Sequence, residues 1–174
     1  DRLVDMGIEP FLIASTVRAG VGQRLVRRLC VDCRKDYQPE AAVLTQIAEI
    51  FHIDKPEIMQ QVSELEKQAL AGGIGATNPS KINTRSTTEL SSSPQGIARL
   101  WKAHEGGCES CGHTGYKGRM GIYEALGNTP AIQKLIVTNG TSDILQQQAI
   151  KDGMIIMQLD GFIKVLRGQT SVEE

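Results

Sequence analysis

The fold of this chain depends on two short stretches, Cys30-Val31-Asp32-Cys33 and Cys108-Glu109-Ser110-Cys111. They hold all 4 cysteines of the 174 residues, so every thiol belongs to a pair. Two residues between paired thiols let one tight turn direct both sulfurs at a single ion. Two such turns supply the thiolates of a closed tetrahedral zinc site. The spacing therefore predicts a structural Zn²⁺ ion bound by Cys30, Cys33, Cys108 and Cys111.

Other uses of a Cys-x-x-Cys pair explain the sequence less well. A c-type haem requires a histidine after the second cysteine, but Arg34 and Gly112 occupy those positions. A thioredoxin-like redox pair would use one motif and leave the other without a role. Disulfides suit short secreted scaffolds, and this sequence shows no signal peptide. Catalytic zinc is not expected, because four thiolates leave no open coordination position.

The overall composition excludes some classes of protein. The chain has 19 Lys plus Arg and 20 Asp plus Glu, giving a formal net charge of -1, which argues against a general nucleic-acid binder. Hydrophobic residues make up 40% and aromatic residues only 4%, so we expect a mostly aliphatic core. No apolar run is long enough to span a bilayer. We therefore expect the chain to work in a reducing cytoplasm.

The sequence before the first cysteine pair predicts a helix followed by a strand. Pro10 suits a first helical turn, and Ile13, Val17 and Val21 recur every four residues through a predicted helix over 10–21. Residues 23–30 then predict a strand that delivers the first pair. Its arginines suit either a solvated strand edge or contact with phosphate or an acidic neighbouring subunit; they are Arg24, Arg27 and Arg28.

The segment between the cysteine pairs predicts helices, a loop and a strand. Apolar stripes over 39–71 indicate two amphipathic helices. Residues 72–95 are rich in Gly, Ser, Thr and Asn, which predicts a flexible loop. Residues 97–103 predict a strand that leads to the second pair. A metal bound by both pairs would therefore join the two ends of this long segment.

The sequence after the second pair predicts a glycine-rich turn, a strand and then helices. Glycines 115, 118 and 121 indicate the turn, and residues 122–126 indicate the strand. Helices are predicted to begin at Thr129-Pro130, at Thr141 and after Gly153. The last of them is predicted to end at Gly168.

Several segments together resemble one family. They include Gln23-Arg24-Leu25-Val26-Arg27-Arg28-Leu29-Cys30 and the run Thr114-Gly115-Tyr116-Lys117-Gly118-Arg119 that follows the second cysteine pair. They also include residues 5–15, 153–154 and 160–168. The set closely resembles the C-terminal part of the hexameric secretion ATPases, which power type IV pilus extension and type II secretion. The resemblance covers about residues 1–37 and 104–174, and the segment between is longer and less familiar.

The resemblance implies an α/β fold, as the C-terminal fragment of a RecA-like ATPase domain. Residues 1–29 would form the tail of the RecA-like core, and residues 30–111 a zinc subdomain with a long insertion. Residues 112–127 would be the glycine-rich turn and the strand that rejoins the core. Residues 128–174 would form a C-terminal helical subdomain.

The resemblance also implies cofactors and partners for the complete protein. These are ATP, Mg²⁺, a homohexamer, the remaining domains of the same ATPase, an inner-membrane platform and cytoplasmic adaptor proteins. The implied location is the cytoplasm, peripheral at the inner membrane through partner proteins.

One departure from the family limits what this chain is expected to do. It contains no Gly-x-x-x-x-Gly-Lys-Ser/Thr loop, so nothing in it cradles the phosphates of ATP. We therefore expect a non-catalytic module, the tail of such an ATPase, that does not hydrolyse ATP alone. The alternative function is a zinc-ribbon module that binds nucleic acid, and a third is a redox switch.

Three further residues are candidates for a nucleotide site or a subunit boundary. Arg119 lies among glycines, where a guanidinium group can approach an anion closely. Gln23 and Arg24 match the Gln-Arg pair of the family. The alternative for Arg119 is an ordinary surface arginine beside a turn.

Overall fold

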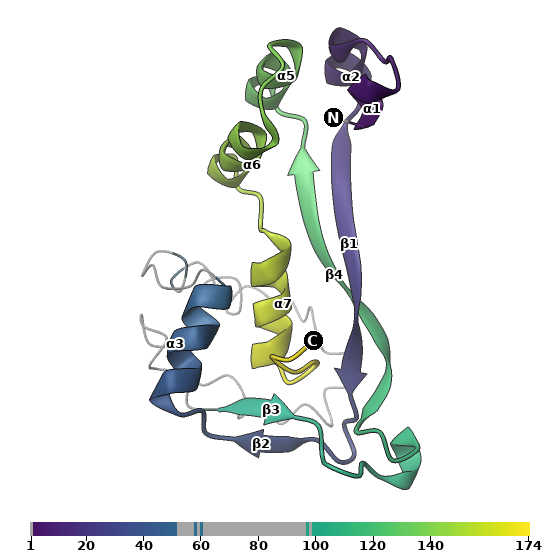
Figure 1. Cartoon of the computed structure of the whole chain (residues 1–174), viewed down its shortest axis with the longest axis vertical. Helices are drawn as coiled ribbons and strands as arrows, with labels where there is room; N and C mark the ends of the chain where they lie inside the picture. Colours follow the sequence, from purple (N-terminus) through teal and green to yellow (C-terminus); the bar gives the residue numbers. More distant parts are fainter. Residues whose placement is uncertain (1, 52–57, 59, 61–96, 98) are drawn as a thin grey trace, which may run out of the picture. The chain divides into compact units, whose positions relative to one another are not determined.

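The structure is a computed structural model that describes residues 2–51, 58, 60, 97 and 99–174. It contains both helices and strands, in agreement with a mixed α/β fold (Figure 1). The elements are α1 (Arg2–Asp5), α2 (Pro10–Thr16), β1 (Ala19–Leu29), β2 (Lys35–Tyr37), α3 (Ala41–Ile50), β3 (Leu100–Lys102), the 3-10 turn η3 (Glu109–Cys111), β4 (Tyr116–Gly127), α5 (Pro130–Val137), α6 (Ser142–Lys151) and α7 (Met157–Leu166). The loop predicted at 72–95 lies outside the described residues, as does most of the second helix predicted within 39–71.

The chain divides into two compact units. Unit 1 comprises Asp1–Arg24 and Ile122–Asp160, and unit 2 comprises Leu25–Gly121 and Gly161–Glu174. Strands β1 and β4 pair in a two-stranded sheet, and both strands cross from one unit into the other.

In unit 1, helix α2 is shorter than the sequence predicted. It ends at Thr16, because Val17 already has an extended backbone with φ -68 and ψ 129, and β1 begins at Ala19. Val21 is 67% exposed, so it belongs to no buried helical face. The prediction of a helix over 10–21 was therefore wrong beyond Thr16. Two glycines and the β-branched Val21 disfavour helix there, and pairing with β4 favours an extended chain.

Helices α2 and α5 pack against each other in unit 1. The side-chain amide of Asn128 donates to the carbonyl oxygens of Ala14 (2.8 Å) and Val17 (2.6 Å), which satisfies acceptors at the end of α2. Helix α5 begins as predicted, since the Thr129 hydroxyl accepts a hydrogen bond from the amide of Ile132 at 3.3 Å. Ile132 of α5 is fully buried.

Unit 2 has a small sheet and an apolar core. Strands β2 and β3 pair antiparallel, with Asp36 opposite Trp101. The strand predicted at 97–103 is therefore present, although it spans only Leu100–Lys102. The rings of Phe51 and Phe162 lie 5.2 Å apart between centroids. The largest fully buried side chains of this unit are Phe162, Ile47, Leu100, Val165 and Cys30.

The turn predicted around Arg119 is a strand in the structure. Strand β4 runs without interruption from Tyr116 to Gly127. Gly118 has a positive φ of 78 inside it, a conformation that glycine adopts without steric cost. The chain reverses earlier, where Gly112, His113 and Gly115 have φ values of 60, 63 and 76. Arg119 is therefore displayed from an exposed strand and not from a turn.

Candidate metal centre

Each cysteine pair is closed by a tight backbone turn. After β1, the amides of Cys33 and Arg34 both donate to the carbonyl of Cys30, at 3.3 and 2.9 Å. In the second pair, the amide of Cys111 donates to the carbonyl of Cys108 at 3.1 Å across the 3-10 turn. These turns direct both thiols of a pair the same way, as the two-residue spacing predicts.

The structure brings the four sulfurs together. Each Sγ lies within 4.8 Å of the other three. The Sγ atoms of Cys30 and Cys108 are 3.8 Å apart, those of Cys33 and Cys111 are 3.9 Å apart, and those of Cys108 and Cys111 are 3.7 Å apart. A tetrahedral ion with Zn–S bonds of about 2.3 Å has ligand sulfurs separated by about 3.8 Å. The cluster therefore has the size that a single Zn²⁺ ion requires.

Backbone amides support a negative charge on Cys111. The amides of Cys108 and Gly115 each donate to the Cys111 sulfur at 3.2 Å. The hydrogen bond from Cys108 is the largest cause of a Cys111 pKa lowered to about 6. The carbonyl of Gly115 also accepts from the amide of Cys30 at 3.0 Å, which joins the two turns. Gly115 thus supports the cluster through both of its backbone polar groups.

The other thiols respond differently to their surroundings. Desolvation is the largest cause of a Cys33 pKa raised to about 12, and it also raises the pKa of Cys108. Both groups are therefore neutral thiols near pH 7 when no metal is bound, whereas Cys111 is mostly a thiolate. A bound cation would reverse this for the raised thiols, because a metal ligand must be deprotonated.

Zinc binding is therefore expected to release protons. Cys33 and Cys108 alone should lose about two protons per ion near pH 7.5, while Cys111 contributes little, so the total number released should be about two or more. Apparent zinc affinity should consequently fall as the pH is lowered. Calorimetric titration of the metal-free chain in buffers of different ionisation enthalpy measures this number. A zinc-binding enthalpy that is independent of the buffer would contradict the expectation.

The nucleotide or subunit-boundary candidates lie in different units. Gln23 and Arg24 are exposed on β1 in unit 1, where the Gln23 amide donates to the Tyr123 hydroxyl at 3.2 Å. Arg119 is exposed on β4 in unit 2. Among the described residues, no hydrogen bond or ion pair engages the Arg119 side chain. Its guanidinium group is thus available to an anion.

Sequence reasoning missed one residue beside the cluster. Arg34 directly follows Cys33, donates a hydrogen bond to the carbonyl of Gly168, and lies over the ring of Trp101 at 4.3 Å from its centroid. Gly168 is 134 residues away along the chain, so no local pattern indicates the contact. The sequence offers only the basic residue after the cysteine pair.

Comparison with known proteins relates the whole chain to one family. The family described as Type II/IV secretion system protein matches residues 1–174. The chain is 32% identical over 173 residues to "Type II secretion system protein E" of Aeromonas hydrophila, covering 99% of this chain and 25% of that protein. It is 31% identical over 173 residues to "Type IV pilus assembly ATPase PilB" of Pseudomonas aeruginosa, covering 99% and 23% respectively.

A third relative gives the same result. The chain is 31% identical over 173 residues to "Type IV pilus assembly ATPase PilB" of Thermus thermophilus, covering 99% of this chain and 15% of that protein. The chain spans a quarter or less of the length of these relatives. Because the match extends over all of its residues, the chain belongs to the Type II/IV secretion system protein family.

Proposed function

We propose that this chain is a non-catalytic module of a ring-forming ATPase for type II secretion or type IV pilus assembly. We also propose that Cys30, Cys33, Cys108 and Cys111 hold a structural Zn²⁺ ion. The observation that carries the proposal is a cluster of four thiols of tetrahedral dimensions in a chain that matches the secretion family throughout.

The role of the ion is expected to be structural because of its donor set. Four thiolates fill a tetrahedral site and leave no position for water or substrate. Residues of the chain supply the supporting contacts: Gly115 hydrogen-bonds to both cysteine turns. The first turn connects β1 to β2, and the second, which contains η3, lies between β3 and β4. The apparent binding free energy of such a site, on the order of 10 kcal/mol, stabilises the folded chain, because the site is not formed when the chain is unfolded.

The proposal extends to the domain organisation of this chain and to the complete protein. The proposal includes a RecA-like core with its tail at residues 1–29, a zinc subdomain at 30–111, a rejoining strand within 112–127 and a helical subdomain at 128–174. It also includes ATP, Mg²⁺, a homohexamer, and partners at the cytoplasmic face of the inner membrane. None of the helices among the described residues has the length and apolar character to cross a bilayer.

Metal content and turnover test the proposal together. The purified chain should carry one zinc ion that resists mild reductant. It should show no more ATP turnover than the Cys30→Ser variant, since neither has a phosphate-binding loop. Turnover above that control would overturn the non-catalytic assignment.

Two other results would favour the alternative functions. Salt-dependent DNA binding would favour the zinc-ribbon alternative, and thiols that are oxidised without metal would favour a redox switch.

Arg119 is proposed to face phosphate or a subunit boundary in the complete ATPase. Its guanidinium group, which is exposed and has no hydrogen bond or ion pair with the residues that the structure describes, supports this, and so does its match to the family motif. Arg119→Ala in the complete protein should lower ATP turnover by about tenfold or more, as loss of a phosphate-facing arginine commonly does. Lys117→Ala is the matched control, because Lys117 is an exposed cation on the same strand. Equal turnover in the two variants would indicate an ordinary surface arginine.

A further inference from the structure

Residues 168–174, which follow α7, lie against the strand that delivers the first cysteine pair. The Leu29 amide donates to the carbonyl of Gln169 at 2.9 Å, and the Thr170 hydroxyl donates to the carbonyl of Arg27 at 2.8 Å. Thr170 and Ser171 are only 2% and 3% exposed. This segment is therefore docked on unit 2 through specific contacts and is not a loose extension.

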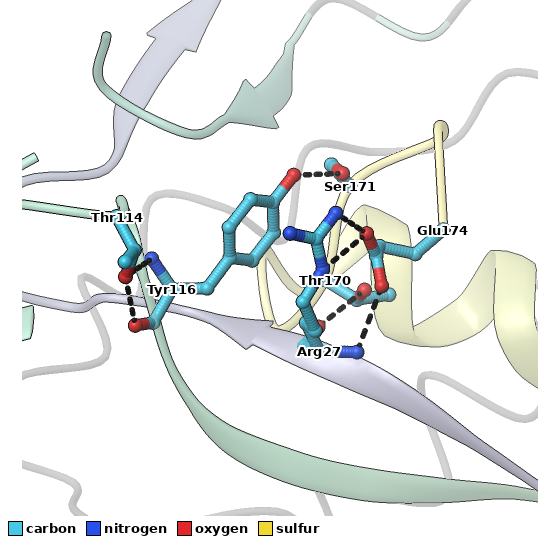
Figure 2. Close-up of polar contacts among 6 residues, drawn as sticks. All are labelled: Arg27, Thr114, Tyr116, Thr170, Ser171 and Glu174. Atoms are coloured by element: carbon cyan, nitrogen blue, oxygen red, sulfur yellow. Dashed lines mark hydrogen bonds and ion pairs between the residues drawn. The ribbon is translucent and has the colours of Figure 1, made fainter. Parts of the chain in front are cut away.

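Glu174 and Arg27 form the outer anchor of the segment (Figure 2). The Glu174 carboxylate accepts from the backbone amide of Arg27 at 3.0 Å and from its Nε at 2.7 Å, with a further contact to the guanidinium group. The guanidinium group lies over the ring of Tyr116, 4.1 Å from the centroid, and the Tyr116 hydroxyl is 3.0 Å from the Ser171 hydroxyl. The side chains of Arg27 in β1 and Tyr116 in β4 thus hold residues 168–174 in place.

Gly168 forms the inner anchor, beside the first cysteine turn. Its carbonyl accepts a hydrogen bond from Arg34, the residue after Cys33. A Cβ atom on Gly168 would lie 2.5 Å from Cδ1 of Trp101, so the segment is in close contact with the indole ring. Trp101 is the single tryptophan of the chain and therefore reports directly on this contact.

The anchors all lie close to the cysteine turns along the chain. Arg27 and Leu29 precede Cys30, Arg34 follows Cys33, and Tyr116 follows Cys111. We propose that metal loading of the four-cysteine cluster docks residues 168–174, so that the segment is a latch that opens when the metal is lost. The proposal rests on the metal site proposed above and adds a moving element to it.

Metal binding and docking of residues 168–174 are thermodynamically linked, so the latch can be tested by changing either one and measuring the other. If the metal favours docking of the segment, docking must favour metal binding by the same factor. Weakening an anchor more than 140 residues from the first cysteine pair should therefore lower metal affinity, although Glu174 is not a ligand. A purely local metal site predicts no such effect.

The first experiment removes zinc from the loaded chain with a chelator. Trp101 emission should shift to longer wavelength, and the amides of Arg27 and Leu29 should exchange with solvent at least about tenfold faster as their acceptors leave. The amides of Asn128 and Gly140, which are bonded within unit 1, are internal controls and should keep their protection. Unchanged exchange at Arg27 and Leu29 after zinc removal would overturn the latch.

The second experiment compares the zinc affinities of two variants by competition with a chromogenic chelator. Glu174→Gln should bind zinc about fivefold more weakly than the parent chain, a smaller effect than loss of a whole charge-assisted contact, because glutamine still accepts hydrogen bonds. Glu173→Gln removes the same charge from an exposed neighbour that acts on Arg27 through its charge alone, so it should weaken zinc binding less than Glu174→Gln does. Equal affinity of the two variants would overturn the latch alone. Failure of every form to bind zinc would overturn the proposed metal site, and the latch with it.

Discussion

Replacing Cys111 by serine should abolish stoichiometric zinc binding and cause a large loss of stability in unit 2. Cys111 is only 9% exposed, and its sulfur lies 3.7 Å from that of Cys108 and 3.9 Å from that of Cys33. A serine hydroxyl does not ionise near neutral pH and cannot replace a thiolate ligand. The zinc-loaded chain should lose several kcal/mol, on the order of half or more of the apparent zinc-binding free energy.

Metal analysis and urea unfolding followed by Trp101 fluorescence measure this effect. Ser110→Ala is the matched control, because Ser110 is exposed in the same turn and its replacement leaves all thiols in place. Chelator should lower the midpoint of the parent chain and of the control towards that of Cys111→Ser, and it should leave the Cys111→Ser midpoint unchanged. A Cys111→Ser chain that keeps one zinc ion and the parent's midpoint would contradict the structural role.

The features that sequence predicted well are those fixed by local chemistry. The two-residue spacing in each cysteine pair determines a tight turn, and the structure places Cys30 and Cys108 with sulfurs 3.8 Å apart. The cap at Thr129 was likewise predictable, because it depends on a hydroxyl and a proline that are adjacent in the sequence. The identity of the metal remains a prediction that rests on the same donor chemistry.

The features that sequence missed depend on partners far along the chain. Val17 and Val21 have helical spacing, yet the chain is extended at Val17, and Val21 lies in β1, which pairs with β4 about 100 residues later. Glycines around Arg119 suggested a turn, but pairing keeps the strand continuous and Gly118 absorbs the distortion. The contact of Glu174 with Arg27 joins residues 147 apart, which no local pattern reveals. Tertiary contacts here override local preferences.

Gly107→Ala should damage the metal centre without changing a ligand. Gly107 has a positive φ of 53, and a Cβ atom there would lie 2.5 Å from the backbone carbon of His113 and 2.6 Å from the amide nitrogen of Gly115. Both clashes involve backbone atoms, so no side-chain rotation relieves them. The Gly115 amide donates to the Cys111 sulfur at 3.2 Å, so moving it disturbs that ligand directly.

Gly106→Ala separates the clash from the cost of the backbone conformation. Gly106 also has a positive φ, 76, but a Cβ atom there would meet nothing within 4 Å. It should cost about 1 kcal/mol of unfolding free energy from left-handed strain alone. Gly107→Ala adds the overpacking, for a total of about 3 kcal/mol or more.

Zinc competition and urea unfolding of both variants give the decisive comparison. Gly107→Ala should bind zinc roughly 10- to 100-fold more weakly than the parent chain, the range found when support around a metal ligand is lost. Gly106→Ala should bind zinc as the parent does, since its strain reaches no ligand. If the two variants were equally affected, the close approach of Gly107 to residues 113–115 would not support the cluster, and backbone strain alone would account for both results.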